Sequence, residues 1–82
     1  MEVKFSHDAL EDIEEIEPEA WEQIKPKIRE VSGSLSHEEI KLIQNPLLEH
    51  PVWQLNIEDT GHRVYLDVIN AEMVVIAVFE FD

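Results

Sequence analysis

The chain has 82 residues, of which 19 are acidic and 6 are basic, so its net charge is −13. A surface this rich in carboxylates repels phosphate, which disfavours binding to free nucleic acid and favours a basic protein partner or a high-salt cytoplasm. The absence of cysteine excludes disulfides and thiolate zinc sites, and a chain of this length holds one domain with one core.

The apolar C-terminal segment is too short to cross a membrane. Its longest uninterrupted apolar run, residues 73–79, has 7 residues, whereas a spanning helix needs about 20. The N-terminus lacks a charged region followed by an apolar stretch, so we expect no signal peptide. These features predict a cytoplasmic protein without a membrane segment.

The N-terminal part of the chain predicts one strand and two helices. Residues 1–5 are β-branched or aromatic at alternate positions, which is typical of a strand. Ser6 can cap the helix that follows, and Pro18 fits the first position of a second helix. The apolar positions of the second helix recur at helical spacing: Ala20, Ile24, Ile28 and Val31. Pro26 interrupts this stripe, and we expect a kink or a break there.

A third, short helix is predicted in the middle of the chain. Ser36 and Glu39 have the spacing of a capping box, and Leu35 and Ile40 flank them at the spacing of a hydrophobic staple. The residues at 45–46, Asn and Pro, would end this helix.

From residue 51 onward the apolar residues follow a period of two, which predicts strands. Turn signals at residues 59–61 and 70–71 divide this segment into three strands. The order of elements is therefore β-α-α-(short α)-β-β-β, an α+β fold that forms one domain over residues 1–82. We expect an antiparallel sheet that the N-terminal helices cover on one face.

The register that keeps apolar residues on one face of the sheet fixes the position of Arg63. The pairs expected across residues 70–71 are all apolar: Val68 with Met73, Leu66 with Val75, and Val64 with Ala77. The pairs expected in the preceding hairpin are also apolar: Ile57 with Val64, Leu55 with Leu66, and Trp53 with Val68. That hairpin would turn through residues 60–61 or 59–62. Arg63 then lies opposite Glu58 on the outer face, where an exposed ion pair is worth about 0.2–1 kcal/mol.

The last strand is apolar on both sides. In the expected register Val74, Ile76 and Val78 share the outer face with Tyr65. Because a strand that is apolar on both sides is usually covered on both, we expect a second cover over this face. The middle segment of the chain, a partner protein, or a second copy in a homodimer could supply it.

The order of elements and several short motifs resemble the RelE/ParE toxin superfamily of bacterial and archaeal toxin–antitoxin systems. The opening strand and first helix of that family are similar to VKFSHDALEDIEEI, and its three-stranded sheet is similar to HPVWQL, HRVYLDV and MVVIAV. The resemblance implies a sheet flanked by two N-terminal helices, whose outer face binds RNA in the RelE branch and a gyrase-type partner in the ParE branch. It also implies an antitoxin peptide that wraps around the domain.

For the RelE branch, the resemblance implies cleavage of mRNA on the ribosome. Basic side chains there stabilise the charge on phosphate, and a Tyr, His or acidic group assists proton transfer. Arg63 matches the arginine at the start of the middle sheet strand, and Arg63 and Tyr65 are the candidate catalytic residues. The family's lysines on the preceding strand have no counterpart in residues 54–59. Residues 79–82, Phe-Glu-Phe-Asp, stand where RelE members continue with His-Arg.

The charges of the C-terminal half argue against phosphoryl chemistry. From Leu42 onward Arg63 is the one cation, and the carboxylates are Glu49, Glu58, Asp59, Asp67, Glu72, Glu80 and Asp82. Because phosphoryl transfer depends on positive charge where negative charge develops, we predict a degenerate or absent endonuclease site and action through protein binding.

The candidate binding residues belong to the outer face and its turn: Val74, Ile76, Val78, Glu58 and His62. His62 is also a candidate for acid–base chemistry, with a turn histidine beside solvated acids as the alternative. The histidines share no metal-ligand spacing, so we predict no metal and no other cofactor. The acidic run over residues 11–17 is either a solvated face or a docking surface for a basic partner.

Three hypotheses about function follow. The first is a toxin component that an antitoxin peptide or another basic protein binds. The second is a non-enzymatic acidic interaction module, an inhibitor or adaptor that occupies a basic protein surface by charge mimicry. The third is homodimerisation through the apolar outer face.

Overall fold

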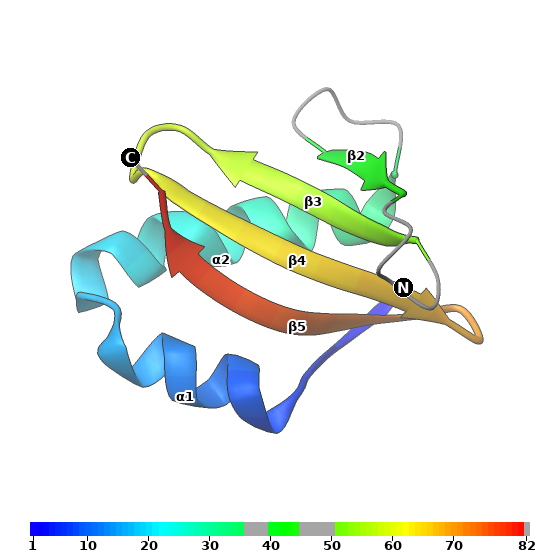
Figure 1. The fold of residues 1–82 in the computed structure, drawn as a ribbon, viewed down its shortest axis with the longest axis horizontal. Coiled ribbons are helices and arrows are strands. Elements are labelled where there is room, and N and C mark those ends of the chain that lie inside the picture. The colour runs from blue at the N-terminus through cyan, green and yellow to red at the C-terminus, as the bar shows by residue number, and fades with distance from the viewer. Residues whose placement is uncertain (36–39, 45–50, 82) are drawn as a thin grey trace.

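Two helices pack on one face of a five-stranded sheet in the computed structural model of this chain (Figure 1). The structure describes residues 1–35, 40–44 and 51–81. The elements in chain order are β1 (Glu2–Phe5), α1 (His7–Glu15), α2 (Pro18–Gly33), β2 (Ile40–Ile43), β3 (Val52–Ile57), β4 (His62–Ile69) and β5 (Glu72–Glu80). This arrangement confirms the predicted α+β class, with N-terminal helices on one face of the sheet.

The strands lie in the order β1-β5-β4-β3-β2. β1 runs parallel to β5, and the other neighbouring strands are antiparallel. The sheet is therefore mixed, and the prediction of a wholly antiparallel sheet is wrong for this pair. The backbone N–H of Ser6 extends the parallel pairing by donating to the carbonyl of Val75 at 2.9 Å.

The predicted third helix is wrong over Ile40–Ile43, which forms strand β2 at the edge of the sheet. Its capping box at Ser36 and Glu39 and its stop signal at residues 45–46 lie outside the described residues. Ile40 lies opposite Leu55 and is buried. Burial against the sheet outweighs the local helix signals here, because intrinsic propensity is a weak preference that tertiary packing overrides.

Helix α2 continues through Pro26 without a break. A proline at this position cannot donate to the carbonyl of Glu22. Both residues are exposed, so water can satisfy that carbonyl. The helix therefore keeps its continuous apolar stripe.

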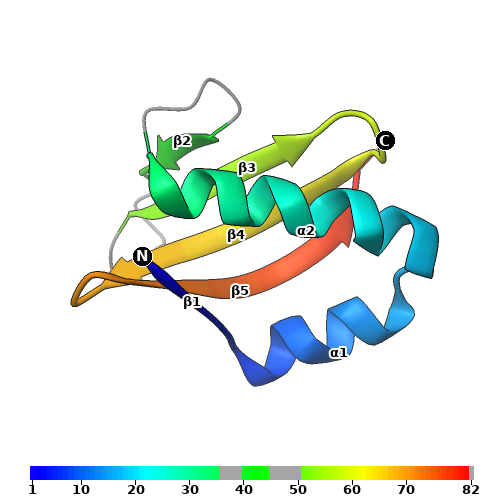
Figure 2. The same cartoon turned by 180° about the vertical axis from the view of Figure 1, so that it is seen from behind.

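The core lies between the two helices and the face of the sheet that they cover. Its buried apolar residues are Ala9, Ile24, Ile28, Val31, Ile40, Leu55, Ile57, Val64, Leu66, Met73, Val75 and Val78. Figure 2 shows α2 lying along β3 and β4, with α1 beside β5. A side chain of α1 anchors β5 directly, because Asp12 Oδ2 accepts the backbone N–H of Val78 at 3.0 Å.

The hairpin between β4 and β5 turns at Asn70–Ala71, as predicted. Both residues have positive φ, 50° and 63°, as the tight turn of a two-residue hairpin requires. The predicted pairs of Val68 with Met73 and Leu66 with Val75 are confirmed. The third pair is wrong, because the register shifts between Tyr65 and Leu66 and leaves Ile76 without a partner on β4.

The unpaired residue Ile76 forms a β-bulge in β5. The bulge reverses the face of the sheet to which the side chains after Ile76 point. Val64 pairs with Val78, not with Ala77. Val78 is therefore part of the core, and its predicted position on the outer face is wrong. Ser6 helps to hold the bulge, because its Oγ donates to the carbonyl of Ile76 at 2.9 Å.

The hairpin between β3 and β4 is two residues out of the predicted register. Its pairs are Ile57 with His62, Leu55 with Val64, and Trp53 with Leu66. The turn comprises residues 58–61 and ends at Gly61, whose φ is 71° and whose N–H donates to the carbonyl of Ile57 at 3.0 Å. A shift of two residues keeps every side chain on its predicted face. It changes the residues that lie opposite each other.

Candidate functional site

The helix-free face is the side of the sheet that α1 and α2 do not cover, and it faces the reader in Figure 1. It consists of the outward positions of the strands, which alternate with the core positions. The polar and aromatic residues near the start of β4 form what we call the Arg63 cluster: Gln54, Asn56, Arg63, Tyr65, Phe79 and Phe81.

Arg63 lies opposite Asn56 on β3 and Phe79 on β5. Its Nε donates to Asn56 Oδ1 at 3.1 Å, and its Cζ lies 5.0 Å from the centre of the Phe81 ring. Gln54 Nε2 donates to the same Asn56 oxygen at 3.2 Å. The guanidinium is therefore held in place by a neutral amide and by an aromatic ring.

The predicted ion pair between Arg63 and Glu58 is wrong. Glu58 lies in the turn of residues 58–61 and is exposed, because the register differs by two residues. Within residues 1–35, 40–44 and 51–81, Arg63 makes no ion pair. The sequence signal that could have placed Asn56 opposite Arg63 is the glycine at position 61. Glycine readily adopts positive φ, and Gly61 does so as the last residue of the four-residue turn.

Tyr65 shares the helix-free face with Arg63, as predicted. It lies opposite Gln54 and Ala77, and its ring is 5.2 Å from the ring of Phe79 at an angle of 45°. Phe79 is 41% exposed. The cluster thus presents aromatic surface beside one cation, a combination found both at protein interfaces and on surfaces that stack nucleic-acid bases.

The charge of the helix-free face is close to balanced on the described strands. Its outward cations are Lys4, Lys41 and Arg63, and its outward carboxylates are Glu2, Asp67 and Glu72. Arg63 is the one cation on β3, β4 and β5. Lys41 lies on the edge strand β2, opposite Gln54.

Lys4 on the other edge is engaged by a carboxylate. Its Nζ lies 3.2 Å from Glu72 Oε2. The hydrogen bond and the charge of Glu72, with a smaller contribution from Glu2, raise the pKa of Lys4 above its usual 10.5. Of the other two outward cations, Lys4 is therefore paired with Glu72, and Lys41 lies beside Gln54 at the edge of the Arg63 cluster.

The predicted binding residues divide between the two faces. Val74 lies on the helix-free face, opposite Asp67, and Ile76 is the half-buried bulge residue. Val78 and His62 point toward the helices and are buried, so the outer-face position predicted for Val78 and the turn position predicted for His62 are wrong.

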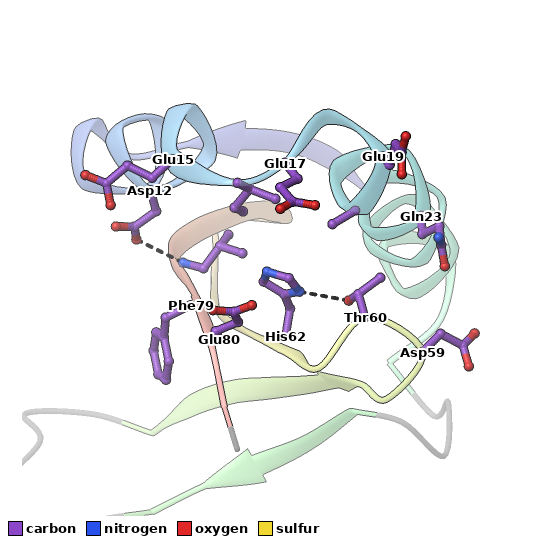
Figure 3. A pocket seen from close by; sticks show the side chains of 13 residues that line it. Asp12, Glu15, Glu17, Glu19, Gln23, Asp59, Thr60, His62, Phe79 and Glu80 are labelled. Carbon is purple, nitrogen blue, oxygen red and sulfur yellow. Dashed lines mark hydrogen bonds between the residues drawn. The ribbon is translucent and has the colours of Figure 1, made fainter.

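His62 begins β4 and is 6% exposed. Its Nδ1 lies 2.9 Å from Thr60 Oγ1. The ring lines an open pocket of about 530 Å³ between the sheet and the junction of α1 and α2 (Figure 3). Local sequence patterns do not indicate this pocket, because its walls come from four segments of the chain.

No group of three or more His, Asp or Glu side chains in residues 1–35, 40–44 and 51–81 is arranged to hold a metal ion. Among the described helices, none is long and apolar enough to cross a membrane.

Comparison with known proteins gives matches among solved structures. No protein-family model and no curated protein sequence matches the chain. The isolated RelE toxin of E. coli superposes with a TM-score of 0.79 and 25% identity, covering 99% of this chain and 84% of that chain. The toxin in the intact E. coli RelBE toxin–antitoxin complex gives 0.78 and 25%, with coverages of 99% and 96%.

A more distant match supports the same fold. The RelB–RelE complex of Methanococcus jannaschii gives a TM-score of 0.67 at 14% identity, over 94% of this chain and 88% of that chain. The element order, the two N-terminal helices and the sheet thus agree with RelE along nearly the whole chain. The structural matches therefore support the assignment of this chain to a RelE-like toxin superfamily.

Proposed function

We propose that this chain is the toxin-like component of a toxin–antitoxin pair and that an antitoxin peptide binds it. We further propose that it acts through protein binding at the helix-free face and does not cut mRNA. The observation that carries the second part is the state of Arg63. It is the one cation on β3–β5, and its Nε is already bonded to Asn56.

The matched structures support an antitoxin partner. E. coli RelE is matched in its intact complex with RelB, and a double arginine-to-alanine variant of that toxin is matched in complex with an antitoxin RelBc peptide. This chain covers 83–96% of the toxin chains in those two structures. The part of the toxin fold available to a peptide is therefore largely present here.

The helix-free face offers little of what phosphoryl chemistry requires. Charge develops on the phosphate in the transition state, and each positioned donor that is removed from such a site costs roughly 10²–10³-fold in rate. Arg63 would have to stabilise that charge alone, because Lys4 is paired with Glu72 and Lys41 lies on an edge strand. This supports a face that does not catalyse cleavage.

The same face has features of a protein interface. Arginine and aromatic residues are enriched at interface centres, where they contribute most of the binding free energy. Arg63, Tyr65, Phe79 and Phe81 meet through ring and guanidinium contacts, and Phe79 is 41% exposed. A partner that covers these rings would bury apolar area around a fixed cation.

A cell-free translation assay tests the proposal. We expect ribosome-bound mRNA to remain intact with the wild-type protein and equally with the Arg63→Ala variant. Lys41→Ala is the matched control, because it removes one positive charge from the same face at its edge. Cleavage that Arg63→Ala abolishes and Lys41→Ala retains would contradict the proposal.

A titration tests the antitoxin part separately. The short protein encoded beside this chain should bind it with one-to-one stoichiometry in isothermal titration calorimetry. Absence of binding by that protein would contradict the toxin–antitoxin assignment without affecting the conclusion about catalysis.

The acidic interaction module is a second candidate, and the helices favour it. The segment from α1 to α2 carries nine carboxylates: Asp8, Glu11, Asp12, Glu14, Glu15, Glu17, Glu19, Glu22 and Glu30. Binding through this surface would weaken steeply with salt. Binding through the aromatic helix-free face would depend on Tyr65 and Phe79 and change little with salt.

A further inference from the structure

The pocket beside His62 lies on the helix-bearing side of the sheet, away from the helix-free face. It is open to solvent and is lined by four segments: the end of α1, the start of α2, the turn of residues 58–61 and the end of β5 (Figure 3). Its carboxylates are Asp12, Glu15, Glu17, Glu19, Asp59 and Glu80, and its lining contains no Lys or Arg. Its volume of about 530 Å³ is within the range of small-ligand sites.

None of the six carboxylates has a cationic partner among the described residues. Asp12 is engaged, because its Oδ2 accepts the backbone N–H of Val78 at 3.0 Å. Within the described residues, the other five make neither an ion pair nor a side-chain hydrogen bond. Glu17 is the N-cap residue of α2, yet its side chain does not cap the helix. These five side chains are exposed, and Glu17 and Glu80 are the ones that lie near His62 in Figure 3. The rim of the pocket therefore carries negative charge that no described cation neutralises.

His62 provides the independent sign of a ligand. Its side chain is 6% exposed and points from β4 toward Glu17 and the junction of the helices (Figure 3). Nδ1 lies 2.9 Å from Thr60 Oγ1, and the described residues supply no hydrogen-bond partner for Nε2. Because buried polar groups are nearly always hydrogen-bonded, Nε2 at the pocket wall is a position where a donor in the pocket can bond.

We infer that this pocket binds arginine side chains of a basic peptide segment that belongs to a protein partner. A guanidinium carries five N–H donors and no acceptor, and its planar fork matches carboxylates in pairs. Nε2 of His62 accepts one of these N–H groups in the tautomer whose Nδ1–H donates to Thr60. The volume admits more than one side chain, and Ile16, Ala20 and Val78 offer apolar contact to the arginine stems.

This inference does not depend on the proposed action of the helix-free face, but it deepens the second candidate, whose carboxylate surface includes Asp12, Glu15, Glu17 and Glu19. The site lies on the opposite side of the sheet from Arg63, and it would exist whether or not the helix-free face cuts RNA. The peptide is defined by its chemistry: a segment with at least two arginines, held by charge and by hydrogen bonds to carboxylates and imidazole.

Nuclear magnetic resonance of the ¹⁵N-labelled imidazole of His62 provides the test. The probe is an acetylated and amidated arginine dipeptide, and the control is the same dipeptide with neutral citrulline in place of arginine. We expect a saturable shift of the His62 ring signals with arginine and none with citrulline. Equal shifts with both probes, or no shift with arginine, would overturn the inference.

Charge-neutralising variants test whether the pocket is specific. We expect Glu17→Gln and Glu80→Gln each to raise the dissociation constant of the arginine dipeptide about threefold, and about tenfold together. Glu14→Gln is the matched control on α1, because it makes the same charge change outside the pocket lining. Glu15→Gln replaces either variant that does not give a folded amide spectrum.

One outcome of the variant series and one of a competing titration with spermidine would each overturn the inference. An equal weakening by Glu14→Gln would indicate only a general negative field. A shift of His62 by spermidine at lower concentrations than by the dipeptide would assign the pocket to a polyamine instead of a peptide.

Discussion

The two faces of the sheet differ in charge, in packing and in what their polar groups contact. The helix-bearing face holds the core, and the segment from α1 to α2 over it carries nine carboxylates against three cations: Lys25, Lys27 and Arg29. On the helix-free face, the described strands balance Lys4, Lys41 and Arg63 against Glu2, Asp67 and Glu72. The excess of negative charge in the chain, whose net charge is −13, therefore lies more on the helical segment than on the helix-free face of the sheet.

This difference shows why a charge count along the sequence misjudges a surface. Of the carboxylates that follow Leu42, Glu80 points to the pocket, and Glu58 and Asp59 lie in a turn. The proposal that this face does not cleave RNA rests instead on Arg63 being the one cation of β3–β5. Position and partners decide the chemistry of this face.

The largest expected contrast is in stability. Leu66→Ala removes a side chain that is 0% exposed between the helices and the sheet, and it should lower the free energy of unfolding by about 2–5 kcal/mol. Phe79→Ala on the helix-free face should cost less than about 1 kcal/mol. Urea denaturation measures both, and equal losses would contradict the assignment of the core to one face.

The anchor between α1 and β5 should have the next largest effect. Asp12→Ala leaves the N–H of Val78 without the acceptor that lies 3.0 Å away, at a cost of about 1–3 kcal/mol. Glu14→Ala on the same helix is the control and should be nearly neutral. Urea denaturation that found the two variants equally stable would show that the Asp12 bond does not hold β5.

Within the helix-free face, Arg63→Ala should lower the free energy of unfolding by about 1 kcal/mol, because it removes the bond to Asn56 and the contact with Phe81. Lys41→Ala should change it less. A thermal denaturation series that reversed this order would indicate that the guanidinium is not held as the structure describes.

The smallest effect concerns the edge pair of Lys4 and Glu72. Because Glu72 raises the pKa of Lys4 above 10.5, the pair stabilises the fold fully below pH 10.5 and loses this effect as pH rises above it. Lys4→Met should therefore melt slightly below the wild type at about pH 8, and the difference should shrink toward about pH 12. A difference that grew with pH would contradict this sign.

Local signals were sufficient to predict much of the fold. Ser6 does cap α1, with its Oγ accepting the N–H of Ala9 at 3.1 Å. The turn at Asn70–Ala71 and the placement of Arg63 and Tyr65 on one face also follow from adjacent residues. Each of these features depends on a few neighbours in the chain.

The features that were missed depend on distant contacts. The bulge at Ile76 is held by Ser6, and Val78 is held by Asp12, across separations of 70 and 66 residues. Strand β2 forms because β3 offers an edge beside Leu55. The shift in the β3–β4 hairpin kept the apolar alternation intact, so that pattern alone could not choose between the two registers.

The central claim is that the helix-free face lacks the positive charge needed to engage RNA. A short single-stranded RNA titrated into ¹⁵N-labelled protein at about 0.1 M salt, with the Nε–H of Arg63 and the amides of β3–β5 observed, tests it most directly. The account predicts no saturable shift of these signals. A saturable shift centred on Arg63, with an affinity that falls steeply as salt rises, would contradict it.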